Sequence, residues 1–296
     1  MSGTSESLRR KIETASDLNG VVRSMKALAA SSIGQYENAV ESLNYYYRTV
    51  ELGLTACFRR SPVEAVSLTV ESRNKGLVGG VIFGSDQGLV GQFNELLVEF
   101  ALRELKSIPG RTTKLWTVGE RIRGQIMDSG FVQATLLPVP TSVDGITPLV
   151  GTILIEIERA RALDEVEEVY LFHNQPKSGA IFEPVKTRVL PFDRSWQNRL
   201  AVLPWPTRNP PEVIEGTASI LPAYIRGYLF VLLFRACAES LASENASRLA
   251  SMQRAEKNIG EILEELNRTF HRTRQESIDE ELFDVISGYE ALSSRS

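Results

Sequence analysis

The chain has few of the residues that usually carry catalysis or bind metal. Its 296 residues include only two cysteines and two histidines. Neither Cys57 nor Cys237 has another cysteine or a histidine close to it in the sequence. The pattern therefore predicts neither a zinc site nor a disulfide framework. Two lone thiols are typical of a reducing compartment.

The chain also lacks an excess of basic residues and a long hydrophobic run. Lys and Arg number 33 against 37 Asp and Glu, which gives a formal net charge of −4. This balance argues against general binding to nucleic acid, which needs a basic surface. The longest apolar run, 228–234, is far shorter than the ~20 residues of a membrane span. We expect no secretory signal, and we expect a chain that is either soluble or held on a membrane complex through partners.

Proline is absent from both ends of the chain, before Pro62 and after Pro222. Each end carries a stripe in which steps of four and three residues alternate, the spacing by which one helix packs along another. The first stripe consists of Leu8, Ile12, Ala15, Asn19, Val22, Lys26, Ala29, Ile33, Tyr36, Val40, Leu43, Tyr47, Val50 and Leu54. The second consists of Ala238, Ala242, Asn245, Leu249, Met252, Glu256, Ile259, Leu263, Leu266, Phe270 and Thr273. We predict a long antiparallel coiled coil of the N- and C-terminal helices, which would form a shaft.

The middle of the chain alternates between short apolar runs and helical patterns. Strands are predicted at 79–85, 114–118, 132–137, 168–172 and 185–190, and helices at 92–107, 119–127 and 148–162. This alternation predicts a Rossmann-like α/β domain with a mostly parallel sheet. The proline-rich stretch 191–222 is predicted to be a stiff, extended connector or a hairpin edge. The expected organisation is a shaft helix at 1–61, an α/β domain at 62–221 and a second shaft helix at 222–296.

Two features interrupt the stripes. Asn19, Lys26, Asn245 and Glu256 place polar groups inside them, where such groups commonly fix the register of a coiled coil. After Phe270 the stripe moves to Arg274 and Ile278, in two successive steps of four residues. Such a stutter unwinds a coiled coil locally. We expect the second helix to leave its partner there, which makes the charged cluster of residues 268–281 a candidate contact surface.

Candidate chemical sites are few. The glycine-rich loop Gly84–Gly91 lies between a strand and a helix, where a phosphate could bind, but it lacks the spacing of a known nucleotide motif. A tight turn is the favoured interpretation. His173 and His271 have no partner at meaningful spacing, so structural roles are expected. We predict no catalytic, cofactor-binding or metal-binding residue.

Three stretches carry a resemblance to a known family. They are residues 8–31, the sequence SDQGLVGQFN at 85–94, and residues 243–288. In this order they resemble the γ subunit of F-type ATP synthases, whose loop sequence SDRGLCGGLN is close to 85–94. Val90 replaces the usual cysteine and Gln92 a usual glycine, and residues 32–35 are neutral where many relatives are basic. The chain is also similar to γ subunits of the divergent N-type bacterial ATPases.

The resemblance implies a non-catalytic rotor shaft without a cofactor of its own. Its partners would be the α and β subunits of a catalytic ring, the ε subunit and the membrane c-ring. It would lie peripherally on the cytoplasmic side of the cell inner membrane and couple ion flow to the β catalytic sites. Residue by residue, the resemblance implies contacts with β at Met25, Lys26, Thr273, Arg274 and Gln275. Two alternatives stay open, an α/β nucleotide-binding protein and a coiled-coil scaffold.

Overall fold

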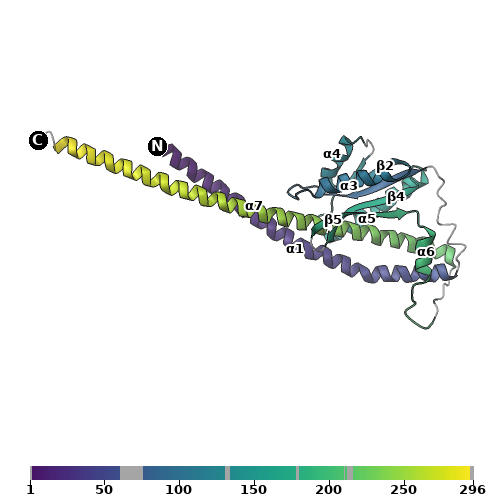
Figure 1. Cartoon of the computed structure of the whole chain (residues 1–296). Helices are drawn as coiled ribbons and strands as arrows, with labels where there is room; N and C mark the ends of the chain where they lie inside the picture. Colours follow the sequence, from purple (N-terminus) through teal and green to yellow (C-terminus); the bar gives the residue numbers. More distant parts are fainter. Residues whose placement is uncertain are drawn as a thin grey trace. The chain divides into compact units, whose positions relative to one another are not determined.

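The computed structural model describes residues 2–60, 76–130, 134–177, 180–209, 211 and 216–293. The chain forms two compact units. The helix-pair unit consists of Met1–Ala29 and Leu249–Ser296, and the α/β unit consists of Ala30–Arg248. Helices α1 (Ser2–Arg60) and α7 (Thr217–Ser293) contribute to both units (Figure 1).

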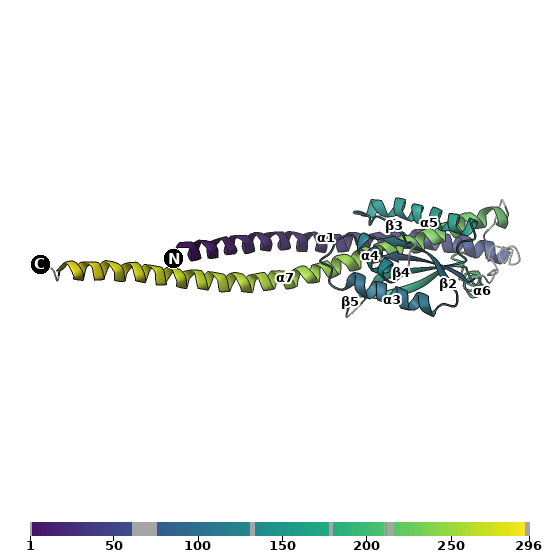
Figure 2. The same ribbon diagram turned by 90° about the horizontal axis from the view of Figure 1, so that it is seen from above.

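Helices α1 and α7 pack against each other in opposite directions within each unit (Figure 2). In the helix-pair unit, Val22 clusters with Met252 and Ile259. In the α/β unit, the ring of Tyr47 lies 5.9 Å from the ring of Tyr228. Contact positions therefore rise along α1 as they fall along α7. This confirms the predicted antiparallel pairing.

Both predicted stripes coincide with the packed faces of these helices. Every position of the first stripe from Leu8 to Leu54, and every position of the second from Ala238 to Thr273, is buried or half-buried. Most residues between these positions in the helix-pair unit are exposed, whereas polar ones of α7 in the α/β unit, such as Ser240 and Ser243, are buried. Gly53 sits inside this contact, since a Cβ at Gly53 would lie 2.2 Å from the ring of Tyr224. Glycine usually destabilises a helix interior, and its presence at position 53 is explained by this close approach of the two helices.

The α/β unit contains one five-stranded sheet with the order β3-β2-β1-β4-β5. The strands are β1 (Leu77–Phe83), β2 (Arg111–Val118), β3 (Ala134–Leu137), β4 (Glu168–Lys177) and β5 (Ala180–Leu190). Strands β1 to β4 pair in parallel, and β5 pairs antiparallel with β4 at the edge. Helices α3 (Phe93–Ser107), α4 (Glu120–Asp128) and α5 (Ile146–Ala162) connect them, with the short helix η1 (Val143–Gly145) before α5. The predicted mostly parallel, Rossmann-like layer is confirmed.

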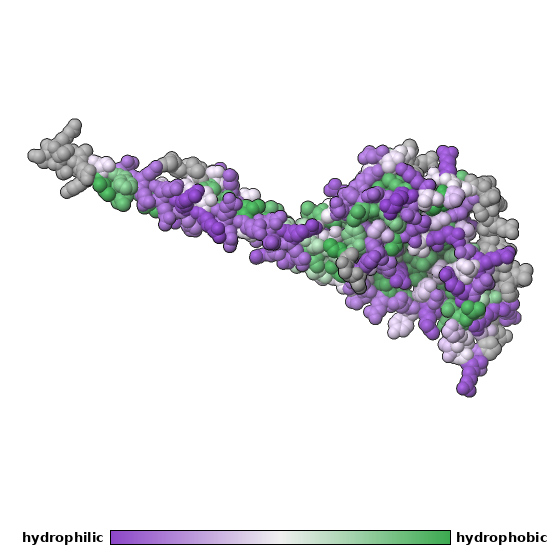
Figure 3. Space-filling view, in the orientation of Figure 1, coloured by the Kyte–Doolittle hydropathy of each residue, from purple (hydrophilic) through white to green (hydrophobic). Residues whose placement is uncertain are grey.

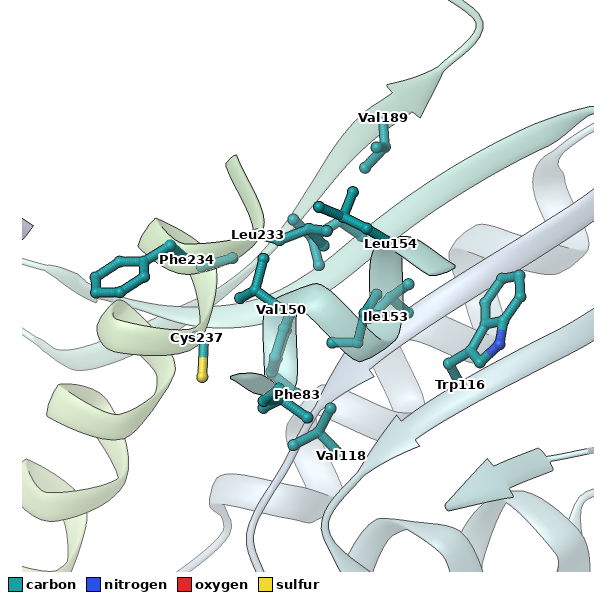
Figure 4. Close-up of a cluster of buried hydrophobic side chains, with 14 of the residues drawn as sticks. Phe83, Trp116, Val118, Val150, Ile153, Leu154, Val189, Leu233, Phe234 and Cys237 are labelled. Carbon is teal, nitrogen blue, oxygen red and sulfur yellow. The ribbon is translucent and has the colours of Figure 1, made fainter. Parts of the chain in front are cut away.

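The two faces of the sheet have separate cores. On one face, Val81 and Phe83 of β1 pack with α5 and α7, and Figure 4 shows Val150 and Leu233 converging with Phe83. On the other face, Val78 and Ile82 pack with α3 and α4. Alternate side chains of a strand point to opposite faces, so β1 supplies both cores. Helix α7 therefore covers one face of the sheet in the α/β unit and is also one helix of the coiled coil.

Helix α7 is unusually apolar where it covers the sheet. Within Ser219–Ser287 it contains an 18-residue window with a mean hydropathy of 1.5, and half of that window is buried inside the structure. Length and composition alone would suit a membrane span. Leu229, Leu233 and Leu241 belong to the core against the sheet. Packing against both α1 and the sheet accounts for this apolar character.

The proline-rich stretch 191–222 differs from its prediction. It contains helix α6 (Arg194–Ala201), in which Asp193 Oδ1 accepts a 2.7 Å hydrogen bond from the backbone N of Trp196. Trp196 packs against Phe58 and stacks on Phe192. Helix α7 also begins before Pro222, at Thr217. The prediction of an extended connector was wrong, because one N-cap and a few buried side chains suffice for a short helix. Proline is also tolerated near the start of a helix.

Several element limits also differ from the sequence-based ranges. Strands β4 and β5 extend into a hairpin longer than predicted, because their polar outer residues pair across the antiparallel edge. The predicted strand at 132–137 begins at Ala134, and its first two residues lie outside the described ones. The domain limits at 61/62 and 221/222 stay a prediction.

Candidate functional site

The helix-pair unit has a narrow apolar seam. Val22, Met252 and Ile259 are buried there, and Met25, Ala255 and Leu263 pack around them. Met25 therefore lies at the contact between α1 and α7. Few large side chains form this seam, so the two helices bury little apolar area against each other here.

Polar residues within the two predicted stripes meet at one point of this seam. Lys26 Nζ lies 2.5 Å from Glu256 Oε2, and Arg23 Nε donates to Glu256 Oε1 at 3.0 Å. The hydrogen bonds from Lys26 and then Arg23 hold the pKa of Glu256 below its usual range. One carboxylate thus bridges two cations of the partner helix. This arrangement fits the predicted role of polar stripe positions in fixing register.

The two asparagines of the stripes behave differently from this pair. Asn245 donates from Nδ2 to the backbone oxygen of Leu241 at 2.8 Å, and Arg248 Nη1 donates to Asn245 Oδ1 at 3.3 Å. The side-chain oxygen of Asn19 is buried without a hydrogen-bond partner among the described residues. Of the four polar stripe residues, Lys26 and Glu256 are therefore the two with a described side-chain hydrogen bond from one helix to the other.

The predicted contact residues near the end of α7 lie apart from Lys26. Thr273 is half-buried, whereas Arg274 and Gln275 are exposed. Arg274 lies about five helical turns beyond Glu256, or roughly 27 Å along the helix. Within the described part of the chain, no ion pair engages the Arg274 guanidinium. The five predicted contact residues thus form two separate zones along the helix-pair unit.

Beyond Ser277 every described side chain of α7 is exposed, through Ser287. Ser5 near the start of α1 borders the same groove as Thr273 and Ser277. The half-buried stripe continues from Phe270 through Thr273 to Ser277, so the predicted shift of the stripe to Arg274 and Ile278 is wrong. The exposed side chains from Ile278 to Ser287 fit the predicted departure of α7 from its partner, but place it after Ser277.

Large apolar side chains are exposed in the helix-pair unit. Phe283 and Val285 of α7 are 69% and 70% exposed, and Leu28 of α1 is 69% exposed. Figure 3 shows an apolar patch near the C-terminal end of α7 among hydrophilic side chains. Contiguous exposed apolar residues commonly mark a surface for a partner. The stripe pattern did not point to Leu28 as a surface residue of interest, because this residue lies off the packed stripe.

A row of serines joins α7 to the carboxyl edge of the sheet within the α/β unit. Ser240 Oγ donates to the backbone oxygen of Phe83 at 3.0 Å, Ser243 Oγ to that of Asn174 at 3.1 Å, and Ser247 Oγ to that of Val90 at 2.5 Å. All three serines are buried. Their spacing places them on one helix face. That spacing was a signal in the sequence, but small polar residues within a helix are usually solvent-facing.

His173 of β4 and Glu239 of α7 reinforce this junction. His173 Nε2 lies 2.9 Å from Glu239 Oε2, and Arg235 Nε donates to Glu239 Oε1 at 2.7 Å. Burial opposes the charge of Glu239, but the hydrogen bonds from His173 and Arg235 prevail and lower its pKa. His173 is buried and held by these contacts, which fits the structural role expected for it.

The loop Gly84–Gly91 forms a tight turn with close backbone contacts. A Cβ at Gly84 would lie 2.4 Å from Ile122, and Leu89 has a positive φ of 64°. Asp86 accepts hydrogen bonds from the backbone N of Glu120 at 2.9 Å and of Val139 at 3.1 Å. A carboxylate therefore already occupies backbone donors that a phosphate would need, and it would repel an anion. This geometry favours the tight-turn interpretation.

Comparison with known proteins gives a consistent result along the chain. A family model described as ATP synthase matches residues 4–292. The ATP synthase gamma chain of Nitratidesulfovibrio vulgaris is 30% identical over 218 residues, covering 72% of this chain and 73% of its own length. That of Syntrophus aciditrophicus is 28% identical over 302 residues, covering 96% of this chain and 97% of its own length.

Solved structures share the fold at low sequence identity. A chain in the Euglena gracilis mitochondrial ATP synthase structure of OSCP, F1 and c-ring has a TM-score of 0.64 at 13% identity, covering 99% of this chain and 95% of its own. A chain in the rotor structure of the same synthase has a TM-score of 0.61 at 14% identity, covering 94% and 100%. Both likenesses concern the fold alone.

Proposed function

This chain belongs to the ATP synthase γ-chain family, and from that premise we propose how it works as the asymmetric rotor shaft of an F-type ATP synthase. It is a non-catalytic subunit, because catalysis in this family belongs to the β subunits. The observation that carries the rotor assignment is the antiparallel pairing of the two chain ends, which Lys26 and Glu256 join.

The proposed mechanism is differential contact. Two unlike helices present different side chains around the axis of the shaft. Each β subunit of the ring would therefore meet a different set of side chains. A shaft shifts a conformational equilibrium only through a difference in contact free energy between states. About 1.4 kcal/mol of such difference changes an equilibrium constant tenfold. Ion flow through the c-ring would turn the shaft and move this difference from one β subunit to the next.

The contact residues of this mechanism are proposals drawn from the resemblance. Met25 and Lys26 would face the moving part of β, with Lys26 anchored by Glu256 on its inner side. Thr273, Arg274 and Gln275 would hold a loop of β. The exposure of Arg274 and Gln275 supports this role. A guanidinium that forms no ion pair with the described part of the chain suits a bidentate bond to a partner carboxylate.

We place the chain with α and β subunits in a catalytic ring, with an ε subunit and with the c-ring. It would lie peripherally on the cytoplasmic side of the inner membrane, attached only through partners. The similar solved structures are a rotor and an assembly of OSCP, F1 and c-ring, both of the Euglena gracilis mitochondrial synthase, and this likeness supports these partners here. Membership of the N-type bacterial subgroup is proposed from the resemblance alone, and Val90, Gln92 and the neutral residues 32–35 are departures from the common γ pattern.

Purification of the chain, tagged at its native locus, from membranes in mild detergent tests this assignment. Mass spectrometry should recover α, β, ε and c subunits together with it. The sequence of the recovered c subunit tests the N-type assignment and identifies the translocated ion. Recovery of the chain with unrelated partners would contradict the rotor assignment. Limited proteolysis of the same sample tests the proposed domain limits at 61/62 and 221/222.

The contact assignment is tested separately with the double variant Arg274→Ala, Gln275→Ala. Loss of charge-assisted bonds should slow coupled ATP synthesis at least about tenfold. Arg254→Ala is the matched control, because Arg254 is an exposed arginine of α7 outside the candidate contact cluster 268–281 and bonds within its own helix. Unchanged synthesis in the double variant would show that these residues do not hold β.

A further inference from the structure

The α/β unit has a small apolar cavity that the rotor mechanism does not use. It lies between α5, the segment after β5 and the first turns of α7, and has a volume of about 180 Å³. Aliphatic and aromatic side chains form most of its wall, among them Leu154, Ile157, Phe192, Ile225 and Leu229. Leu154, Ile157 and Leu229 are buried, so the inner wall is part of the core.

One charged side chain that lines this apolar cavity has no counter-ion among the described residues. Arg161, in the last turn of α5, is half-buried. Among the described residues, no carboxylate lies within ion-pair distance of its guanidinium, and burial lowers its pKa. By contrast, Arg226 on the rim lies 3.6 Å from Glu158. A partly desolvated cation without an anion is an unfavourable arrangement that a bound anion would relieve.

We propose that this cavity binds a small amphipathic carboxylate, with its carboxylate on Arg161 and its alkyl chain against the apolar wall. Guanidinium groups hold carboxylates through two parallel hydrogen bonds. An apolar cavity of roughly 150 Å³ accommodates a six-carbon ring, so this volume suits a chain of about six to eight carbons. The expected ligand class is therefore a medium-chain fatty acid.

Calorimetric titration of the purified full chain with octanoate, without detergent, tests the proposal. We expect a dissociation constant of roughly 0.1–1 mM, a value typical of a ligand of this size. Octan-1-ol lacks the charge and acetate lacks the chain, so both should bind at least about tenfold more weakly. Shortening octanoate to hexanoate should weaken binding about fourfold for each methylene removed.

Two variants separate a binding site from a merely structural arginine. Arg161→Gln should weaken octanoate binding at least about tenfold. Arg159→Gln is the matched control, because Arg159 is an exposed arginine of the same helix turn that does not line the cavity. Ile225→Trp should fill the cavity and abolish binding. Circular dichroism melts establish that each variant folds.

The proposal is overturned if octanoate fails to bind the folded wild-type chain, or binds Arg161→Gln as tightly. Either result would mean that the Arg161 side chain only covers apolar surface with its stem. Neither result bears on the rotor assignment, because co-purification with α, β and c subunits does not depend on this cavity. The two claims therefore fail independently.

Discussion

Lys26 Nζ lies 2.5 Å from Glu256 Oε2, although the two residues are separated by 230 positions in the chain. Arg23 approaches the other oxygen of the same carboxylate. The contact therefore sets the register between the N- and C-terminal helices at a defined point. A shaft that transmits torque needs such a fixed register, because slippage between its helices would dissipate rotation.

Glu256→Gln should loosen this part of the helix pair. The neutral amide cannot pair with both cations, so amide hydrogen exchange in residues 19–29 and 249–263 should accelerate by a few-fold. High salt should reduce the difference from wild type, because it screens the ion pairs. Glu261→Gln is the control, since Glu261 is exposed and forms its ion pair, at 3.9 Å, with Lys257 of its own helix. Equal exchange in both variants would argue against a register role.

The serine row predicts a specific loss of stability in the α/β unit. Ser240→Ala, Ser243→Ala and Ser247→Ala each remove a side-chain donor to a backbone oxygen. Each change should cost about 1–3 kcal/mol, and least at Ser247, because the oxygen of Val90 also accepts from the backbone N of Phe93 at 3.3 Å. Chemical denaturation of the purified chain measures this change. Ser42→Ala is the matched control, because its exposed hydroxyl bonds only to Asn38 of its own helix. If all four variants unfold alike, the serines do not hold α7 to the sheet.

Two glycines of α1 should respond oppositely to alanine. A Cβ at Gly34 has no described atom within 4 Å, whereas one at Gly53 would strike the Tyr224 ring. Gly34→Ala should raise stability by about 0.5–1 kcal/mol through helix propensity. Gly53→Ala should lower it by about 1–3 kcal/mol through overpacking. Thermal melts of the two variants test this, and stabilisation by both would contradict the close approach of α1 and α7.

The Glu239 carboxylate should make part of the stability depend on pH. Its pKa is lowered in the folded chain, so its contribution is present above the unfolded value near 4.5 and is lost as pH falls through the folded value. Glu239→Gln should therefore destabilise the α/β unit by about 1–3 kcal/mol at pH 7, and the difference should shrink below pH 4.5. A gap that stays constant down to pH 3 would mean that the charge is not involved.

Local patterns predicted the long helices and the sheet well. The spacing of Leu8 to Leu54 and of Ala238 to Thr273 predicted the packed faces position by position, because a long contact demands strict periodicity. Helix α6 was missed because eight residues flanked by prolines give too short a pattern. Asp193 as an N-cap was the available signal.

Contacts between distant segments could be predicted only in part. Lys26 and Glu256 stood out as polar residues within apolar stripes, but the stripes alone do not say which residue faces which. The hydrogen bond from Ser247 to Val90 depends on how α7 lies across the sheet edge. Arg161 has no ion-pair partner among the described residues. This depends on α5, the segment after β5 and α7, which meet only in the folded chain.

The most direct test of the rotor assignment is observation of rotation. Cys57 and Cys237 are both buried, so Lys106→Cys, at an exposed position of α3, would provide a selectively reactive thiol for a bead. The α and β subunits of the complex would be fixed to a surface, and ATP would be added. We predict unidirectional, stepwise rotation of the bead that stops when ATP is removed. A bead that stays still while the complex hydrolyses ATP at its full rate would contradict the account.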